Sequence, residues 1–183
     1  MPNYRRPGVR GGTYFFTVVT HGRQPVLTQD VVRQALREGI AAARAIMPFK
    51  IEAWVLLPDH LHCIWTLPEG DSGFSARWGI IKRHVTKRCA ARMDDSHRLS
   101  ASRRSRREKA IWQRRFWEHL VRDDTDFNHH VDYVHWNPVK HGYARRAADW
   151  PYSTFRRYVA QGSYPSDWGG ENFSEGADSS YGE

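Results

Sequence analysis

The sequence has few cysteines and no long apolar stretch. Cys63 and Cys89 are the two cysteines in 183 residues, and they form neither a CxxC pair nor a disulfide framework. The longest apolar stretches, residues 14–19 and 53–57, are strand-sized and too short to cross a membrane. No apolar run follows the first arginines, so no signal peptide is expected. We therefore expect a cytoplasmic protein with reduced thiols.

Lysine and arginine are missing from the C-terminal end. All 28 of them lie within residues 1–157, whereas five of the 20 acidic residues follow Arg157. The net charge of +8 is thus the balance of a strongly basic body and an acidic tail. A basic body indicates a polyanionic partner, although charge alone does not distinguish such a protein from one that is merely basic and soluble.

Hydrophobic periodicity predicts an α+β protein with elements in the order β-α-β-β-α-β-α. The first six elements match the ferredoxin-like split βαβ plan, in which an antiparallel sheet carries its helices on one face. The additional helix is expected to cross the opposite face. Strands are predicted at 13–20, 50–57, 60–67 and 116–122, and helices at 31–43 (capped by Thr28), 74–92, 124–137 and, as a short piece, 154–160.

Composition predicts one domain with flexible appendages. The domain is expected to span residues 1–158, beginning with a basic arm at 1–12. A Ser/Arg-rich stretch at 94–110 lacks periodicity and is expected to be a mobile basic loop. Residues 159–183 are expected to form an acidic, flexible tail.

Two histidines on the third predicted strand are candidate metal ligands. Side chains alternate along a strand, so His60 and His62 share one face, whereas Leu61, Cys63 and Trp65 point to the other. Two imidazoles two residues apart can bind one divalent ion. A pair of surface histidines is the alternative, because His-x-His alone is a weak motif.

Tyr133 is a candidate nucleophile. It lies one helical turn before Asn137, on a face offset from the apolar stripe of the predicted helix, so we expect it to be exposed. A phenol that attacks phosphate needs exposure and a nearby cation. The amide oxygen of Asn137 could complete a metal shell, or Asn137 could simply end the helix, because it precedes Pro138.

These motifs resemble those of the REP-associated tyrosine transposases, members of the HUH single-tyrosine superfamily. His60-Leu61-His62 is similar to the His-hydrophobic-His motif, and residues 133–137 (YVHWN) are similar to the tyrosine motif. Insertion-sequence relatives carry glutamine where Asn137 stands. The resemblance extends through YRR at 4–6, GTYFFT at 12–17, LPDH at 57–60, IWQRRFWEH at 111–119, NPVKHG at 137–142 and WPYS at 150–153.

The resemblance implies a metal-dependent endonuclease and strand transferase for single-stranded DNA near hairpins such as REP-like palindromes. Tyr133 would form a 5′-phosphotyrosine link, and His60, His62 and Asn137 would hold Mg²⁺ or Mn²⁺. Zinc is the second choice, although a structural zinc site would need four protein ligands. A monomer is favoured, and a dimer is not excluded. His129, His130, His135 and His141 crowd the same region; we expect exposed helix residues, with a proton carrier as the alternative.

Basic residues outside this site are candidate DNA contacts, because Lys and Arg neutralise phosphates. Trp112, Phe116 and Trp117 are expected to be core residues rather than stacking platforms. The DNA-binding candidates are Tyr4, Arg5, Arg6, Arg10, Lys82, Arg83, Lys87, Arg103, Arg104, Arg114 and Arg115.

Two other functions remain open at the level of sequence. One is a catalytically silent protein that binds DNA hairpins, and the other is a nuclease or binding protein for RNA. Replacing Tyr133 by phenylalanine and exchanging DNA for RNA hairpins would separate them.

Overall fold

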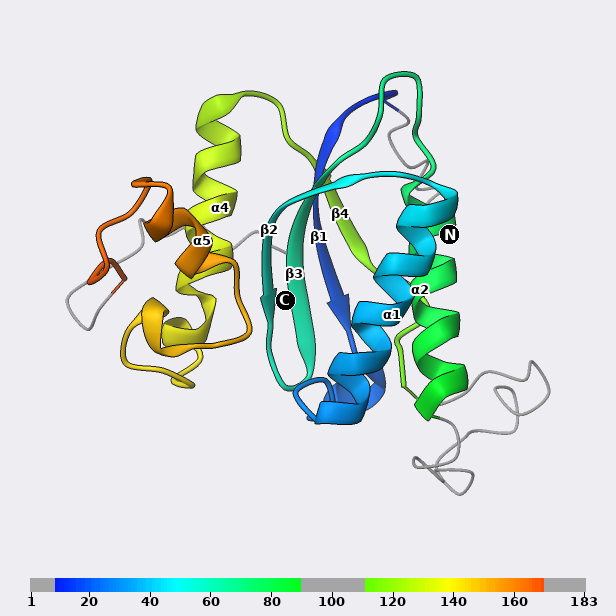
Figure 1. The fold of residues 1–183 in the computed structure, drawn as a ribbon, viewed down its shortest axis with the longest axis horizontal. Helices are drawn as coiled ribbons and strands as arrows, with labels where there is room; N and C mark the ends of the chain where they lie inside the picture. The colour runs from blue at the N-terminus through cyan, green and yellow to red at the C-terminus, as the bar shows by residue number, and fades with distance from the viewer. Residues whose placement is uncertain (1–8, 90–110, 170–183) are drawn as a thin grey trace, which may run out of the picture.

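The computed structural model describes residues 9–89 and 111–169. Four strands form one antiparallel sheet in the order β2-β3-β1-β4, which with the β-α-β-β-α-β order of elements is the ferredoxin-like arrangement. The predicted α+β fold is therefore confirmed (Figure 1). The strands are β1 (Thr13–Val19), β2 (Lys50–Leu56), β3 (His60–Thr66) and β4 (Trp117–Leu120).

Helices cover both faces of the sheet. The helices α1 (Asp30–Ile46) and α2 (Phe74–Cys89) pack on one face, and α4 (Asp124–Lys140) crosses the other (Figure 1). α1 and α2 approach closely at Gly39, where an added Cβ would lie 3.4 Å from the backbone of Ile81. The residues that the structure describes also include three short helices, which are η1 (His21–Arg23), η3 (Ala147–Asp149) and α5 (Phe155–Ala160).

Alternate side chains of β1 pack into two separate hydrophobic cores. Tyr14, Phe16 and Val18 pack in the core beneath α1 and α2, whereas Phe15 packs in the core beneath α4. Both faces of the sheet are thus buried, and polar residues on the α4 face are enclosed rather than solvated. This second core positions the candidate site.

Several predicted boundaries are corrected by the structure. Thr28 does not cap α1: the helix begins at Asp30 with Gln29 at the N-cap position and no side-chain cap. The fourth strand is shorter than predicted, and α4 continues through Pro138 to Lys140 instead of ending at 137. A proline in the last turn removes one N–H, and the N–H of His141 still bonds the carbonyl of Asn137 at 3.1 Å.

The chain after α4 folds back over the edge of β2. The N–H of Leu56 donates to the carbonyl of Tyr152 at 2.8 Å, and Thr154 continues the pairing to Trp54. Residues 161–169, expected to belong to the tail, pack here through Trp168, whose ring centroid lies 5.9 Å from that of Phe155.

The structure does not describe most of the residues predicted to form the arm, the basic loop and the acidic tail. The arm at 1–8, the predicted loop at 94–110 and the tail from 170 lie outside the described residues. No helix among the described ones is long and apolar enough to cross a membrane.

Candidate active site

β3 places His60 and His62 on the face that α4 covers. Leu61 and Cys63 point into the core beneath α1 and α2, so alternation turns the two histidines the other way, as predicted. Their ring centroids are 5.0 Å apart. His60 is 1% exposed and His62 is fully buried, so the alternative of two surface histidines is wrong.

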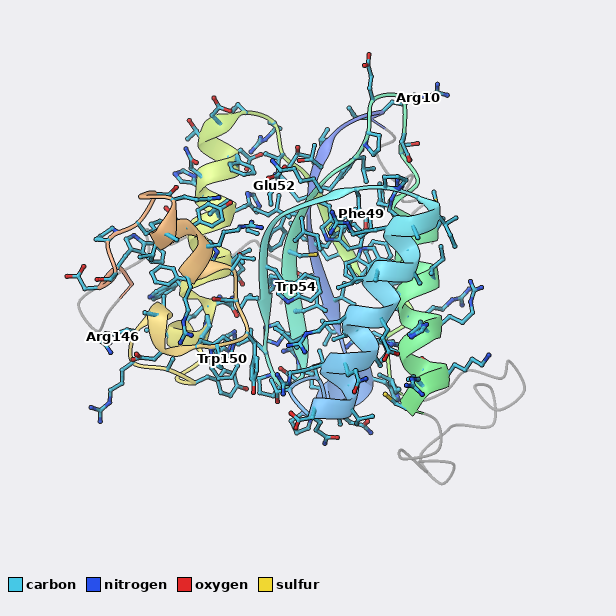
Figure 2. All side chains as sticks on the ribbon, in the orientation of Figure 1. Arg10, Phe49, Glu52, Trp54, Arg146 and Trp150 are labelled. Carbon is cyan, nitrogen blue, oxygen red and sulfur yellow. The ribbon has the colours of Figure 1, made fainter. Side chains whose placement is uncertain are left out.

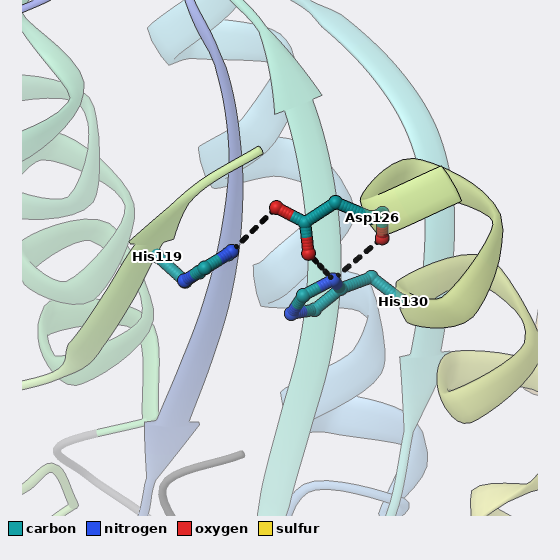
Figure 3. Close-up of side chains that lie close together, drawn as sticks. All are labelled: His119, Asp126 and His130. Carbon is teal, nitrogen blue, oxygen red and sulfur yellow. Dashed lines mark hydrogen bonds and ion pairs between the residues drawn. The ribbon is translucent and has the colours of Figure 1, made fainter. Parts of the chain in front are cut away.

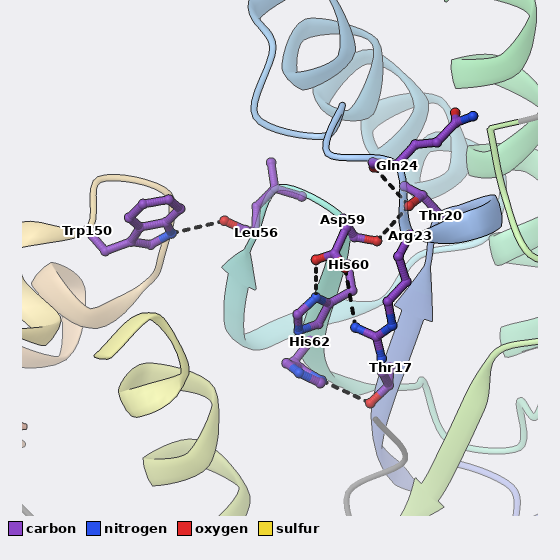
Figure 4. Close-up of polar contacts among 9 residues, drawn as sticks. All are labelled: Thr17, Thr20, Arg23, Gln24, Leu56, Asp59, His60, His62 and Trp150. Carbon is purple, nitrogen blue, oxygen red and sulfur yellow. Dashed lines mark hydrogen bonds and ion pairs between the residues drawn. The ribbon is translucent and has the colours of Figure 1, made fainter. Parts of the chain in front are cut away.

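Each histidine is held through its Nδ1 atom (Figure 4). His60 Nδ1 lies 2.7 Å from Asp59 Oδ1, and His62 Nδ1 lies 2.9 Å from Thr17 Oγ1. Partial burial would raise the pKa of Asp59, but hydrogen bonds from His60 and Arg23 lower it, so its carboxylate stays charged. A carboxylate on Nδ1 leaves the lone pair of His60 on Nε2, which is the arrangement of many metal-binding histidines.

Tyr133 on α4 lies directly beside this pair. Its ring centroid is 5.1 Å from that of His62 and 6.0 Å from that of Phe15. The Nζ atom of Lys140 donates to its hydroxyl at 3.3 Å. The residue is fully buried, so the prediction that it is exposed is wrong. The helix face offset from the main stripe is covered because it packs on the histidine-bearing sheet.

Asn137 lies between two contacts of α4 with β3. One turn before it, Tyr133 meets His62, and one turn after it, the ring of His141 lies 5.2 Å from that of His60. Residues four apart share a helix face, so Asn137 faces the histidine pair and is fully buried. Because α4 continues past it, the interpretation of Asn137 as a helix terminator is wrong.

The donor types gathered here fit a divalent metal ion. Two imidazole nitrogens and one amide oxygen supply three neutral ligands, which Mn²⁺ and Mg²⁺ accept when phosphate oxygens or water complete the shell. His60, His62 and Asn137 are therefore the residues that would hold it. A closed structural zinc site would require a fourth protein ligand.

A second polar cluster lies further along the same face of the sheet (Figure 3). Asp126 Oδ2 lies 2.8 Å from His119 Nε2, and Asp126 Oδ1 lies 3.1 Å from His130 Nδ1. Partial burial would raise the pKa of Asp126, but hydrogen bonds from His119 and Arg122 lower it to about 2. This His-Asp-His group could bind a metal ion. It is also a hydrogen-bonded network without a metal, because His119 and Arg122 hydrogen-bond to the Asp126 carboxylate and His130 Nδ1 lies 2.8 Å from the Asp126 backbone carbonyl oxygen.

The histidines expected on the helix surface divide into two pairs. His129 and His141 are exposed, as predicted, whereas His130 and His135 are buried, so for these two the prediction is wrong. Burial lowers the pKa of His135 to about 3, and its Nε2 meets Thr154 Oγ1 at 2.9 Å. His135 is therefore a neutral structural residue that joins α4 to the C-terminal segment.

The predicted DNA contacts are scattered over the surface. Arg10, Arg83, Lys87, Arg114 and Arg115 are exposed. Lys82 is half-buried and donates to the carbonyl of Gln113 at 3.1 Å. Of the aromatic residues predicted to be core, Trp112 is buried, and Phe116 and Trp117 are half-buried against the two cores. Tyr4, Arg5, Arg6, Arg103 and Arg104 lie outside the described residues.

Sequence reasoning missed Lys140, Thr17 and Asp59. Lys140 follows Tyr133 by seven residues, which is helical spacing, but the expected helix ended at Asn137, before Pro138. Thr17 is opposite His62 in the strand register, a pairing that the sequence alone does not show. Asp59 directly precedes His60 and could have been proposed as its partner.

The chain was compared with known proteins. No family model matches it. A REP-associated tyrosine transposase of Escherichia coli (strain K12) is 48% identical over 179 residues, covering 96% of this chain and 97% of the relative. A provisionally named member of the same family from Haemophilus influenzae is 42% identical over 170 residues, covering 93% and 94%. A solved structure of a REP-associated tyrosine transposase bound to a REP hairpin matches with a TM-score of 0.82 and 47% identity, covering 100% of this chain and 98% of that chain.

These relatives cover nearly the whole chain at well above the identity at which a shared family is secure, and the fold agrees. The chain therefore belongs to the REP-associated tyrosine transposases.

Proposed function

We propose that this protein is a metal-dependent endonuclease and strand transferase that acts on single-stranded DNA beside hairpins. The observation that carries the proposal is the 5.1 Å separation between the rings of Tyr133 and His62, with His60 next to His62. The candidate nucleophile and the candidate metal ligands come from α4 and β3, and they meet at one site.

In the proposed reaction, the hydroxyl oxygen of Tyr133 forms a bond to phosphorus while the bond from phosphorus to the 3′ oxygen breaks. The products are a 5′-phosphotyrosine link and a free 3′-OH, and attack by another 3′-OH reverses the step without ATP. A bound Mg²⁺ or Mn²⁺ would polarise the phosphate and neutralise developing charge.

The chain's own groups supply charge and proton transfer for this step. Lys140 places a positive charge 3.3 Å from the Tyr133 oxygen, where negative charge develops as the phenol loses its proton. His141 is exposed and lies beside His60, so it is our candidate for accepting that proton and returning it to the leaving 3′ oxygen.

The burial of Tyr133 adds a requirement. The Tyr133 side chain is fully buried, so a DNA strand reaches its hydroxyl only after the groups that cover it move aside.

The partner follows from similarity. The related structure is described as bound to a REP hairpin and matches this chain over its full length, so a DNA hairpin with a single-stranded flank is the proposed substrate. A monomer acting in the cytoplasm is the corresponding proposal for assembly and location.

A covalent-capture experiment tests the function. A hairpin oligonucleotide with single-stranded flanks is labelled at its 3′ end and incubated with the protein and Mg²⁺ or Mn²⁺. We expect a labelled adduct that survives denaturation, maps to Tyr133 by peptide mass spectrometry, and is lost with EDTA. The matched control is Tyr133→Phe, which should bind the hairpin but form no adduct.

The burial of Tyr133 favours one alternative, a hairpin-binding protein that has lost cleavage. Hairpin binding without any adduct in the unmodified protein would support this alternative and overturn the nuclease proposal. An RNA hairpin of matched sequence tests whether the protein is instead an RNA nuclease. Adducts that form on RNA alone would show that the substrate is RNA and not DNA.

A further inference from the structure

A cavity of about 520 Å³ lies at the edge of the sheet, away from the candidate active site. It is bounded by α1, by β2 and by residues 151–157. Trp54 is opposite Cys63 in the strand register and therefore points to the α1 side of the sheet, whereas His60 and His62 face α4. Figure 2 shows Trp54 on β2, beside α1. The cavity and the tyrosine site thus lie on opposite faces of the sheet.

The residues that line this cavity include five cations and no acid. Three are on α1, at positions 33, 37 and 44, where spacings of four and seven residues keep them on one helix face. With a rise of 1.5 Å per residue, their Cα atoms are spaced by about 6 and about 10 Å along the helix. The lining cations are Arg33, Arg37, Arg44, Lys50 and Arg157.

Internal ion pairs account for only part of this charge. Arg33 pairs with Asp30, and Lys50 Nζ lies 2.9 Å from Glu52. Arg37 and Arg44 are exposed and form no ion pair in the part of the chain that the structure describes. Two unneutralised guanidinium groups therefore stand beside the cavity, and an anionic ligand would find them available.

The floor of the cavity is aromatic and apolar. Trp54 and Tyr152 are half-buried in it, next to Ile40 and Leu36. The guanidinium of Arg33 lies 4.5 Å from the centroid of the Tyr152 ring, so a planar cation already stacks on this surface. Cations above aromatic rings suit a nucleic-acid strand, because the cations bind its phosphates and unpaired bases stack on the rings.

We propose that this cavity is a second DNA-binding site, which takes a single-stranded segment outside the cleavage site. Arg37 and Arg44 contact phosphates, and an unpaired base stacks in the cavity against Trp54 or Tyr152. A duplex does not fit this description, because its bases are already stacked on one another. The site requires DNA as the ligand but not the chemistry of Tyr133, and it is formed by none of the basic residues that sequence analysis had proposed as DNA contacts.

The experiment measures binding in the Tyr133→Phe background, which removes cleavage from the result. Fluorescence anisotropy is recorded with a labelled oligo-dT strand and with a hairpin that carries a single-stranded flank. The test variant is Arg37→Ala with Arg44→Ala. The control is Arg122→Ala with Arg146→Ala, which lowers the net charge by the same amount at exposed positions that do not line the cavity.

We expect the test variant to bind oligo-dT at least about 10-fold more weakly than its parent, and the control about 3-fold or less. Loss of two single-strand phosphate contacts should also reduce the slope of log K against log salt by about 1.4. Equal losses in the two variants would overturn the proposal, because they would reflect net charge alone. Unchanged oligo-dT binding in the test variant would overturn the proposal too.

Discussion

At the scale of single residues, the contact between Lys140 and Tyr133 has the clearest mechanistic consequence. The ammonium of Lys140 lies 3.3 Å from the hydroxyl oxygen of Tyr133 and 4.7 Å from the centroid of its ring. Both residues are on α4, so the charge and the phenol move together with this helix. A fixed positive charge beside an oxygen that becomes negative stabilises the transition state more than the ground state.

Replacing Lys140 by methionine should therefore slow cleavage. We expect a fall of about 100-fold in the single-turnover rate at saturating hairpin, the size of effect seen when one charge-stabilising donor is removed. Lys140→Arg keeps the charge and should recover most of the rate. If the Lys140→Met variant and its parent cleave at equal rates at saturating DNA, Lys140 has no part in activating Tyr133.

Asp59 is a positioning residue for the metal site. It holds His60 Nδ1 at 2.7 Å and in turn accepts from Arg23 at 3.3 Å. Asp59→Asn keeps the shape but removes the charge that fixes the histidine tautomer, and loss of such partners costs 10- to 100-fold in metal affinity. We expect the Mn²⁺ concentration for half-maximal cleavage to rise by about that factor.

Arg23→Gln provides the comparison for Asp59→Asn. Arg23 is exposed and contacts only the outer oxygen of the carboxylate, so its loss should shift the Mn²⁺ requirement by less than about 3-fold. An Asp59→Asn protein with an unchanged Mn²⁺ requirement would show that Asp59 does not position a ligand.

Residue-level prediction from sequence succeeded where one local rule decides the outcome. Alternation alone placed His60 and His62 on one strand face. It could not show that this face is buried, because burial depends on α4, which begins more than 60 residues later. The exposure expected for Tyr133 failed for the same reason, since a helix face that looks unpartnered in sequence is covered by a distant strand.

At the scale of elements, one buried arginine joins three segments of the fold. Arg77 on α2 is fully buried and donates to the carbonyls of Met47 and Pro48, after α1, and to both carboxylate oxygens of Asp71. The hydrogen bond from Arg77 lowers the pKa of Asp71 below its usual range. The pair therefore anchors the junction between α1 and β2 to the start of α2.

This pair predicts a pH-dependent contribution to stability. Because the folded-state pKa of Asp71 is depressed, its stabilisation is present above the unfolded value of about 3.9 and is lost as pH falls through the folded value. Asp71→Asn should lower the free energy of unfolding by about 1–3 kcal/mol at about pH 7. Denaturant titrations should show this difference in the free energy of unfolding narrowing as the pH falls below about 3.9, the unfolded-state pKa.

Asp149→Asn is the matched control for the acid titration. Asp149 pairs with Arg146 at 2.8 Å on the surface, where solvent screens the pair, so its loss should change the free energy of unfolding much less than the loss of Asp71 does. If the free energy of unfolding of Asp71→Asn stays below that of the parent by the same amount from neutral to acidic pH, then packing at Asp71, and not its charge, stabilises the junction.

Element order was predictable, and element ends were not. Periodicity and turn residues gave the β-α-β-β-α-β order, because each strand and helix satisfies its own local pattern. The end of α4 was misplaced because the rule against helix before proline is a local preference of backbone geometry. Packing of Tyr133 against His62 and of His141 against His60 outweighs this preference, and the helix continues to Lys140.

At the scale of the whole molecule, the sheet separates two surfaces with different proposed roles. The α4 face holds the tyrosine and the histidines, and the α1 face holds the basic cavity at the β2 edge. Residues 151–157 cross that edge and contribute to the cavity, while Trp150, just before them, packs in the core of the α4 face. A strand of DNA that used both sites would wrap around one edge of the sheet, and no sequence pattern could have shown this, because α1, β2 and the C-terminal segment meet only in the fold.

A protein with this charge distribution should bind its hairpin through many phosphates. The sequence pI is about 9.8, and the basic residues are spread along the arm, the helices and the segments between them. If about six phosphates are neutralised, the affinity of the Tyr133→Phe protein for a flanked hairpin should fall by about 10³ between 50 and 200 mM salt. Titrations at several salt concentrations measure this slope. A nearly flat response would mean that base and shape contacts dominate, and the basic surface would then serve solubility and not DNA binding.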